Sequence, residues 1–79
     1  MNLEDQIIEI ISNTLGVEKD SILPESDFYN DFNADKLEVT DLILKIAQEF
    51  KLELNNDDFN KVNTMADLIK LIELNIDEI

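Results

Sequence analysis

The spacing of apolar residues along the chain predicts three helices of ordinary length and one short helix. In residues 3–15 apolar side chains recur at every fourth position, which places them on one face of a helix. Residues 36–51 and 63–75 carry similar stripes. The predicted inward residues are Leu3, Ile7, Ile11 and Leu15, then Val39, Leu42, Ile43, Ile46 and Phe50, and finally Met65, Leu68, Ile69 and Ile72. Between the last two stripes, "LNNDDFNKV" at 54–62 predicts a short helix around 57–61.

The residues that flank these segments match the preferences of helix ends. Gly16, the only glycine, follows the first helix where a left-handed residue is expected. Two segments begin with the spacing of a capping box, in which the cap and the third helical residue bond each other's backbone. The predicted N-caps are Asn2, Asp35, either Asn56 or Asp57, and Thr64, with Glu38 and Asp67 completing the two boxes. On the second helix, Asp41 and Lys45 have the i, i+4 spacing of an ion pair.

Residues 17–34 form a long connection between the first and second helices. Their apolar residues are spaced too irregularly for one helix, and Pro24 disfavours a helix around it. A loop with this much apolar material is expected to be pinned to the core. The predicted fold is therefore an all-α, four-helix bundle that forms a single domain over residues 1–79.

The composition excludes several classes of function. The chain has neither cysteine nor histidine, which removes thiolate metal sites and the commonest general base and zinc ligand. No glycine-rich phosphate loop is present, so we expect no enzyme. A net charge of −13 repels nucleic acid and anionic membranes but favours basic patches on partner proteins. The chain has no apolar run near the ~18 residues of a membrane span and no signal-peptide pattern, so we expect a cytoplasmic protein. We also expect a monomer.

The charge leaves one other class open, an acidic decoy that mimics nucleic acid. A divalent-cation site is a weaker possibility. The segment "NNDDFN" at 55–60 lacks the glycine that a calcium-binding loop needs, so we expect no metal site.

One longer stretch, "DFNADKLEVTDLILKIAQEFKLEL" at 31–54, resembles the acyl carrier protein family. The family pattern is an acidic residue, an apolar residue and Gly-Ala-Asp-Ser-Leu-Asp or a close variant, followed by an acidic helix that ends in Glu-Phe. The matching residues are Asp31, Phe32, Ala34, Asp35, Leu37, Glu38, Asp41, Leu42, Glu49 and Phe50. The segments "LGVEKDSI" (15–22), "SDFYND" (26–31) and "KVNTMADLIKLI" (61–72) extend the resemblance over nearly the whole chain without a gap.

The resemblance implies a four-helix carrier whose serine holds a 4′-phosphopantetheine arm, with an acyl chain attached as a thioester. It also implies that acidic residues dock on basic patches of acyl-metabolism enzymes. At the corresponding positions this chain carries Asp31, Asp35, Glu38, Asp41 and Glu49. The chain departs from the family at the serine itself, which is Lys36, and at Asn33, where a glycine is usual. Lys45, Ala47 and Gln48 replace a small residue and two acids, so the docking face is thinner than in relatives.

Lys36 changes the expected chemistry. Attachment of the arm needs a hydroxyl oxygen that attacks phosphorus, whereas a lysine amine beside Asp35 and Glu38 stays protonated. We therefore expect no cofactor on this chain by the family's route. Thr40 lies one turn further on, about 5.4 Å along the helix, a shift that is hard to accommodate for an enzyme that positions its nucleophile closely. Modification of Thr40 is therefore the less favoured alternative.

Two interpretations of the family resemblance remain open. In the first, the chain is a carrier-derived protein-binding module of fatty-acid or related acyl metabolism. In the second, it is a genuine acyl carrier protein locked in the apo form by the replacement of serine with lysine.

Overall fold

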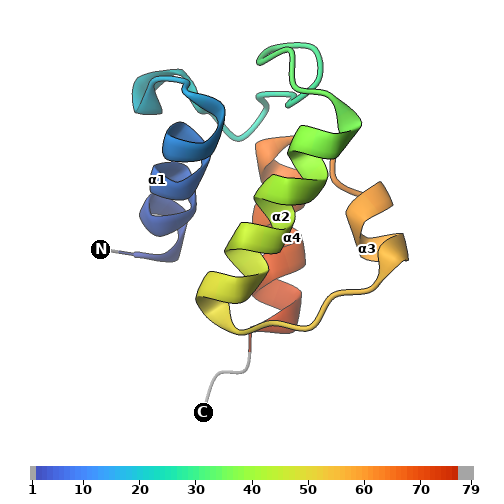
Figure 1. Cartoon of the computed structure of the whole chain (residues 1–79). Helices are drawn as coiled ribbons and strands as arrows, with labels where there is room; N and C mark the ends of the chain where they lie inside the picture. The colour runs from blue at the N-terminus through green and yellow to red at the C-terminus, as the bar shows by residue number, and fades with distance from the viewer. Residues whose placement is uncertain (1, 77–79) are drawn as a thin grey trace.

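The computed structural model describes residues 2–76 and consists of four α-helices joined by loops (Figure 1). The helices are α1 (Leu3–Leu15), α2 (Lys36–Phe50), α3 (Asn56–Asn60) and α4 (Met65–Asn75). One 3₁₀ turn, η1 (Lys19–Ser21), lies in the long connection. Within the described residues there is no strand, only an isolated bridge between Asp27 and Thr64. This arrangement confirms the predicted all-α bundle, with α1 beside α2 and α4 behind α2 in this view.

The capping residues predicted from the sequence are observed at three of the four helices, α1, α2 and α4. Asn2 caps α1 by accepting the Asp5 N–H at 2.8 Å, and Gly16 ends it in the left-handed region at φ 71°. Complete capping boxes start α2 at Asp35 and α4 at Thr64. The ends differ slightly from prediction: α2 stops at Phe50, because Lys51 is left-handed, and α4 starts at Met65 rather than 63.

The predicted start of the short helix is wrong. Helix α3 begins at Asn56, one residue early, and its cap is Asn55 rather than Asn56 or Asp57. The reason is the capping box: Asn55 has Asp58 three residues on, and each side chain bonds the other's backbone N–H at 3.0 Å.

The core contains every predicted inward residue of the three long helices, either fully or partly buried. Leu71 is an addition that the stripe did not predict, because it faces the flank toward α3 rather than the centre of the bundle. Among the described residues, no helix is both long enough and apolar enough to cross a membrane.

The long connection is pinned to the core, as predicted. Phe28 is completely buried, and Ile22 and Ala34 are nearly so, whereas Leu23 stays about half exposed. The loop also bonds the start of α4, where Met65 N–H donates to the Ser26 carbonyl and Ala66 N–H to the Pro24 carbonyl, both at 2.9 Å. This loop therefore caps the start of α4. Its buried Ala34 directly precedes Asp35, the N-cap of α2, so the loop also positions the start of that helix.

Candidate functional site at the start of α2

A turn with one left-handed residue leads into α2. Asn33 is left-handed, with φ 57°, which asparagine tolerates better than most residues. Ala34 is buried, and its N–H donates to the Phe28 carbonyl at 3.0 Å. The rings of Phe28 and Phe32 pack with centroids 6.2 Å apart. Because asparagine tolerates the left-handed region, this turn does not require a glycine at position 33.

A capping box then fixes the first turn of the helix. The Asp35 side chain accepts the Glu38 N–H at 2.8 Å, and the Glu38 side chain accepts the Asp35 N–H at 3.0 Å. Both carboxylates also lie at the positive end of the helix dipole, where negative charge is stabilising. Two of the predicted docking acids therefore have a structural role as well.

Lys36 is the first residue of α2 and its side chain is exposed. Across the described residues, no carboxylate oxygen lies within 4.0 Å of its ammonium group. The backbone carbonyl of Lys36 accepts the Thr40 hydroxyl at 2.9 Å. The nearest hydroxyl of α2 is therefore half-buried and engaged with the helix backbone, one turn away from the helix start.

The structure separates the five predicted docking acids into two groups, although all five are exposed. Asp35, Glu38 and Asp41 lie at the N-cap and in the first two turns of α2. Asp31 lies in the loop before the helix, where its side chain accepts the Asp27 N–H at 2.7 Å. Glu49 lies eight residues beyond Asp41, which is about 12 Å along the helix axis. Only the first four acids lie within five residues of Lys36 in the sequence.

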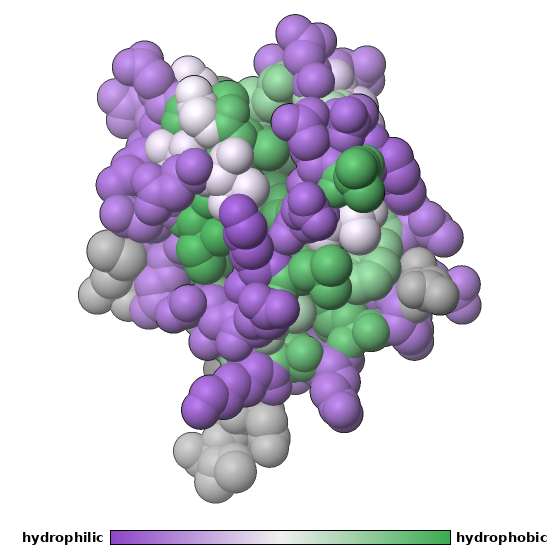
Figure 2. Space-filling view, in the orientation of Figure 1, coloured by the Kyte–Doolittle hydropathy of each residue, from purple (hydrophilic) through white to green (hydrophobic). Residues whose placement is uncertain are grey.

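Sequence reasoning did not single out the exposed leucines of α2 as surface residues. Leu37 is 71% exposed and Leu44 is 41% exposed. Their i, i+7 spacing with Asp41 between them puts all three on one side of the helix, opposite the buried stripe. Figure 2 shows apolar patches on this face of the molecule, bordered by hydrophilic side chains. The helical spacing could have identified them as a second, outward stripe.

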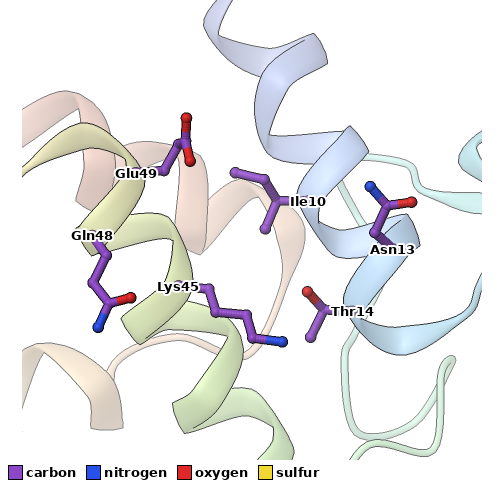
Figure 3. Close-up of a pocket in the computed structure, with 6 residues that line it drawn as sticks. All are labelled: Ile10, Asn13, Thr14, Lys45, Gln48 and Glu49. Atoms are coloured by element: carbon purple, nitrogen blue, oxygen red, sulfur yellow. The ribbon is translucent and has the colours of Figure 1, made fainter.

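The predicted ion pair between Asp41 and Lys45 is not formed in the structure. Figure 3 shows that Lys45 instead extends from α2 toward Thr14 of α1. The two helices enclose a shallow cavity of about 360 Å³ there, lined by Ile10, Asn13, Thr14, Lys45, Gln48 and Glu49. Ala47 is buried, so that position contributes nothing to the exposed face. Lys45 and Glu49 thus belong to the α1–α2 groove rather than to the start of α2.

Comparison with known proteins identifies the family. The family described as the phosphopantetheine attachment site matches residues 5–72. The chain belongs to the acyl carrier protein family. Similar relatives are the acyl carrier proteins of Chlamydia trachomatis serovars L2, D and A, each 38% identical over 73 residues, which is 92% of this chain and 95% of the relative. The members of this family are carriers of acyl metabolism rather than enzymes.

The described residues of this carrier-family chain hold no group of three or more side chains suited to a metal ion. The group that the family implies is 4′-phosphopantetheine. Residues 33–37, which lead into α2 and form its first turn, offer no hydroxyl, because they read Asn-Ala-Asp-Lys-Leu. The residues present therefore do not fit covalent attachment of the arm at this point.

Proposed function

We propose that this acyl carrier protein homologue acts as a protein-docking module of acyl metabolism that is not loaded with 4′-phosphopantetheine. The observation that carries the proposal is Lys36, which stands exposed at the first position of α2 inside an intact capping box. The turn, the cap and the buried Ala34 hold this first position of α2 in place. A hydroxyl nucleophile is what residues 33–37 lack.

The proposed docking face consists of Asp31, Asp35, Leu37, Glu38, Asp41 and Leu44, all of them exposed. Four carboxylates around two leucines suit a partner with a basic rim and an apolar centre. A chain with net charge −13 also attracts such a partner over a distance, so association is fast and weakens with salt. Glu49 stays a predicted contact at the far end of α2.

Under this proposal the partners are basic patches of acyl-metabolism enzymes or of one dedicated protein, and the chain works as a cytoplasmic monomer. The test of docking is titration calorimetry against a carrier-dependent enzyme of the same organism, at low and at moderate salt. Charge reversal by Asp41→Lys should weaken binding severalfold, and Asp20→Lys is the matched control because Asp20 lies in η1, outside the docking face. If both variants weaken partner binding equally, binding depends on the net charge of the chain and not on the proposed docking face.

The test of loading is a reaction with coenzyme A and a phosphopantetheinyl transferase, followed by intact mass. The proposal predicts no added mass on the wild-type chain. The Lys36→Ser variant distinguishes the first alternative, a genuine carrier locked in the apo form. Efficient loading of that variant would favour a locked carrier, whereas a variant that stays unloaded would show that the surroundings have diverged too.

The second alternative, an acidic decoy, rests on the charge alone. It predicts that the chain inhibits a basic DNA-binding protein at low salt. Absence of inhibition would exclude it without affecting the docking proposal.

A further inference from the structure

Lys36 is the one basic residue in the stretch of sequence that contains the proposed docking face, residues 31–44. Its side chain is exposed, and that of its neighbour Leu37 is 71% exposed. A partner that covers the first turn of α2 therefore meets an ammonium group as well as the carboxylates and the leucine. The effect of that ammonium group on the choice of partner follows from its surroundings.

The adjacent carboxylates do not hold the ammonium group in an ion pair. The side chains of Asp35 and Glu38 accept each other's backbone N–H at 2.8 and 3.0 Å in the capping box. Among residues 2–76, no carboxylate oxygen lies within 4.0 Å of the Lys36 ammonium group. A positive charge is also unfavourable at the positive end of a helix dipole. Neither an ion pair nor the stability of α2 therefore accounts for a lysine at this position.

The charge of Lys36 is opposite to the charge that a loaded carrier has at the corresponding point. The family motif predicts Lys36 as the position at which relatives attach the 4′-phosphopantetheine arm. The arm joins its serine through a phosphodiester, which is negatively charged at neutral pH. An enzyme surface that receives a loaded carrier must accommodate this anion, and a surface that is complementary to an anion repels an ammonium group.

We propose that Lys36 is a selectivity residue that disfavours docking on the enzymes that receive loaded carriers. This inference rests on the proposed function, because it requires that the docking face is used. The acids of the face attract a basic partner, while the ammonium group weakens binding to any surface that is built around the phosphate of the arm. The preferred partner is therefore a basic protein that has no basic residue opposite the start of α2.

The test is titration calorimetry of the full chain against a carrier-dependent enzyme at low salt, with wild type, Lys36→Ala and Lys36→Glu. None of these chains has a hydroxyl at position 36, so none gains the usual attachment group. We expect each step in this order to tighten binding about two- to fivefold, the range of an exposed charge pair. The matched controls are Lys61→Ala and Lys61→Glu, because Lys61 is exposed at the end of α3 and makes the same changes in net charge outside residues 31–44.

Equal affinity of the wild type and both Lys36 variants would overturn the inference, and so would equal gains from the Lys61 variants. In either case, weaker binding of Asp41→Lys would leave the docking proposal standing. Absence of binding by every chain would contradict the docking proposal, and this inference with it. Circular dichroism melts establish that each variant is folded before it is titrated.

Discussion

The capping box at Asp35 gives a prediction that separates the structural role of an acid from its docking role. Replacement by alanine leaves the Glu38 N–H without its acceptor, which now lies at 2.8 Å. Loss of an N-cap side chain costs about 0.5–2 kcal/mol, most often ~1. For a domain of 60–100 residues, 1 kcal/mol corresponds to a fall in Tm of roughly 4–8 °C. We therefore expect Asp35→Ala to lower Tm by several degrees.

The matched control is Asp41→Ala, which removes the same charge from the same helix. Asp41 is exposed and forms no ion pair in the structure, so its replacement should change Tm by little. Thermal unfolding followed by circular dichroism gives Tm for the wild type and both variants. Hydrogen exchange should also show a faster Glu38 amide only in Asp35→Ala. If both variants lose the same stability, the effect is one of charge, and the capping argument is refuted.

Three further predictions concern backbone strain and pH. Asn33 at φ 57° should tolerate glycine with little change in the free energy of unfolding, whereas valine should cost about 1–2 kcal/mol; urea unfolding measures both. Lys51 at φ 58° ends α2, so Lys51→Gly should stabilise the fold by about 0.5–1 kcal/mol, and an unchanged urea midpoint would argue against strain there. Burial alone would raise the pKa of Asp67, but the N–H groups of Asn63 and Thr64 and the Thr64 hydroxyl, helped by nearby Lys70, hold it below the ordinary value of 3.8. The folded state thus favours the charged carboxylate, so this contribution is present above about pH 4 and is lost as pH falls further. Asp67→Asn should show a shallower loss of stability between pH 5 and 2 than the wild type, and equal slopes would exclude Asp67 as a source.

Much of the fold could be predicted because the helices carry local signals. The apolar stripes set which face of α1, α2 and α4 is buried, and the boxes at Asp35 and Thr64 set where two helices begin. The start of α3 could not be chosen in the same way. Residues 55–58 read Asn-Asn-Asp-Asp, and every one of these residues is a good N-cap. Only the reciprocal bond between Asn55 and Asp58 selects among them.

The surfaces were harder to predict than the core. The Asp41–Lys45 pair fits the spacing rule, but exposed pairs contribute little and a long lysine side chain can extend elsewhere. Lys45 extends toward α1. By contrast, the family motif placed Lys36 at the start of α2 from the sequence alone, and the helix does start there.

The measurement that tests the central claim most directly is fragmentation mass spectrometry of the chain after production together with a phosphopantetheinyl transferase. Peptides that cover Lys36 and Thr40 report both possible attachment points in one experiment. The account predicts that both peptides have the mass of the unmodified sequence, while the acyl carrier protein of Chlamydia trachomatis, produced in the same way, serves as the positive control for loading. A peptide that carries one phosphopantetheine on Lys36 or Thr40 of the wild-type chain would contradict it.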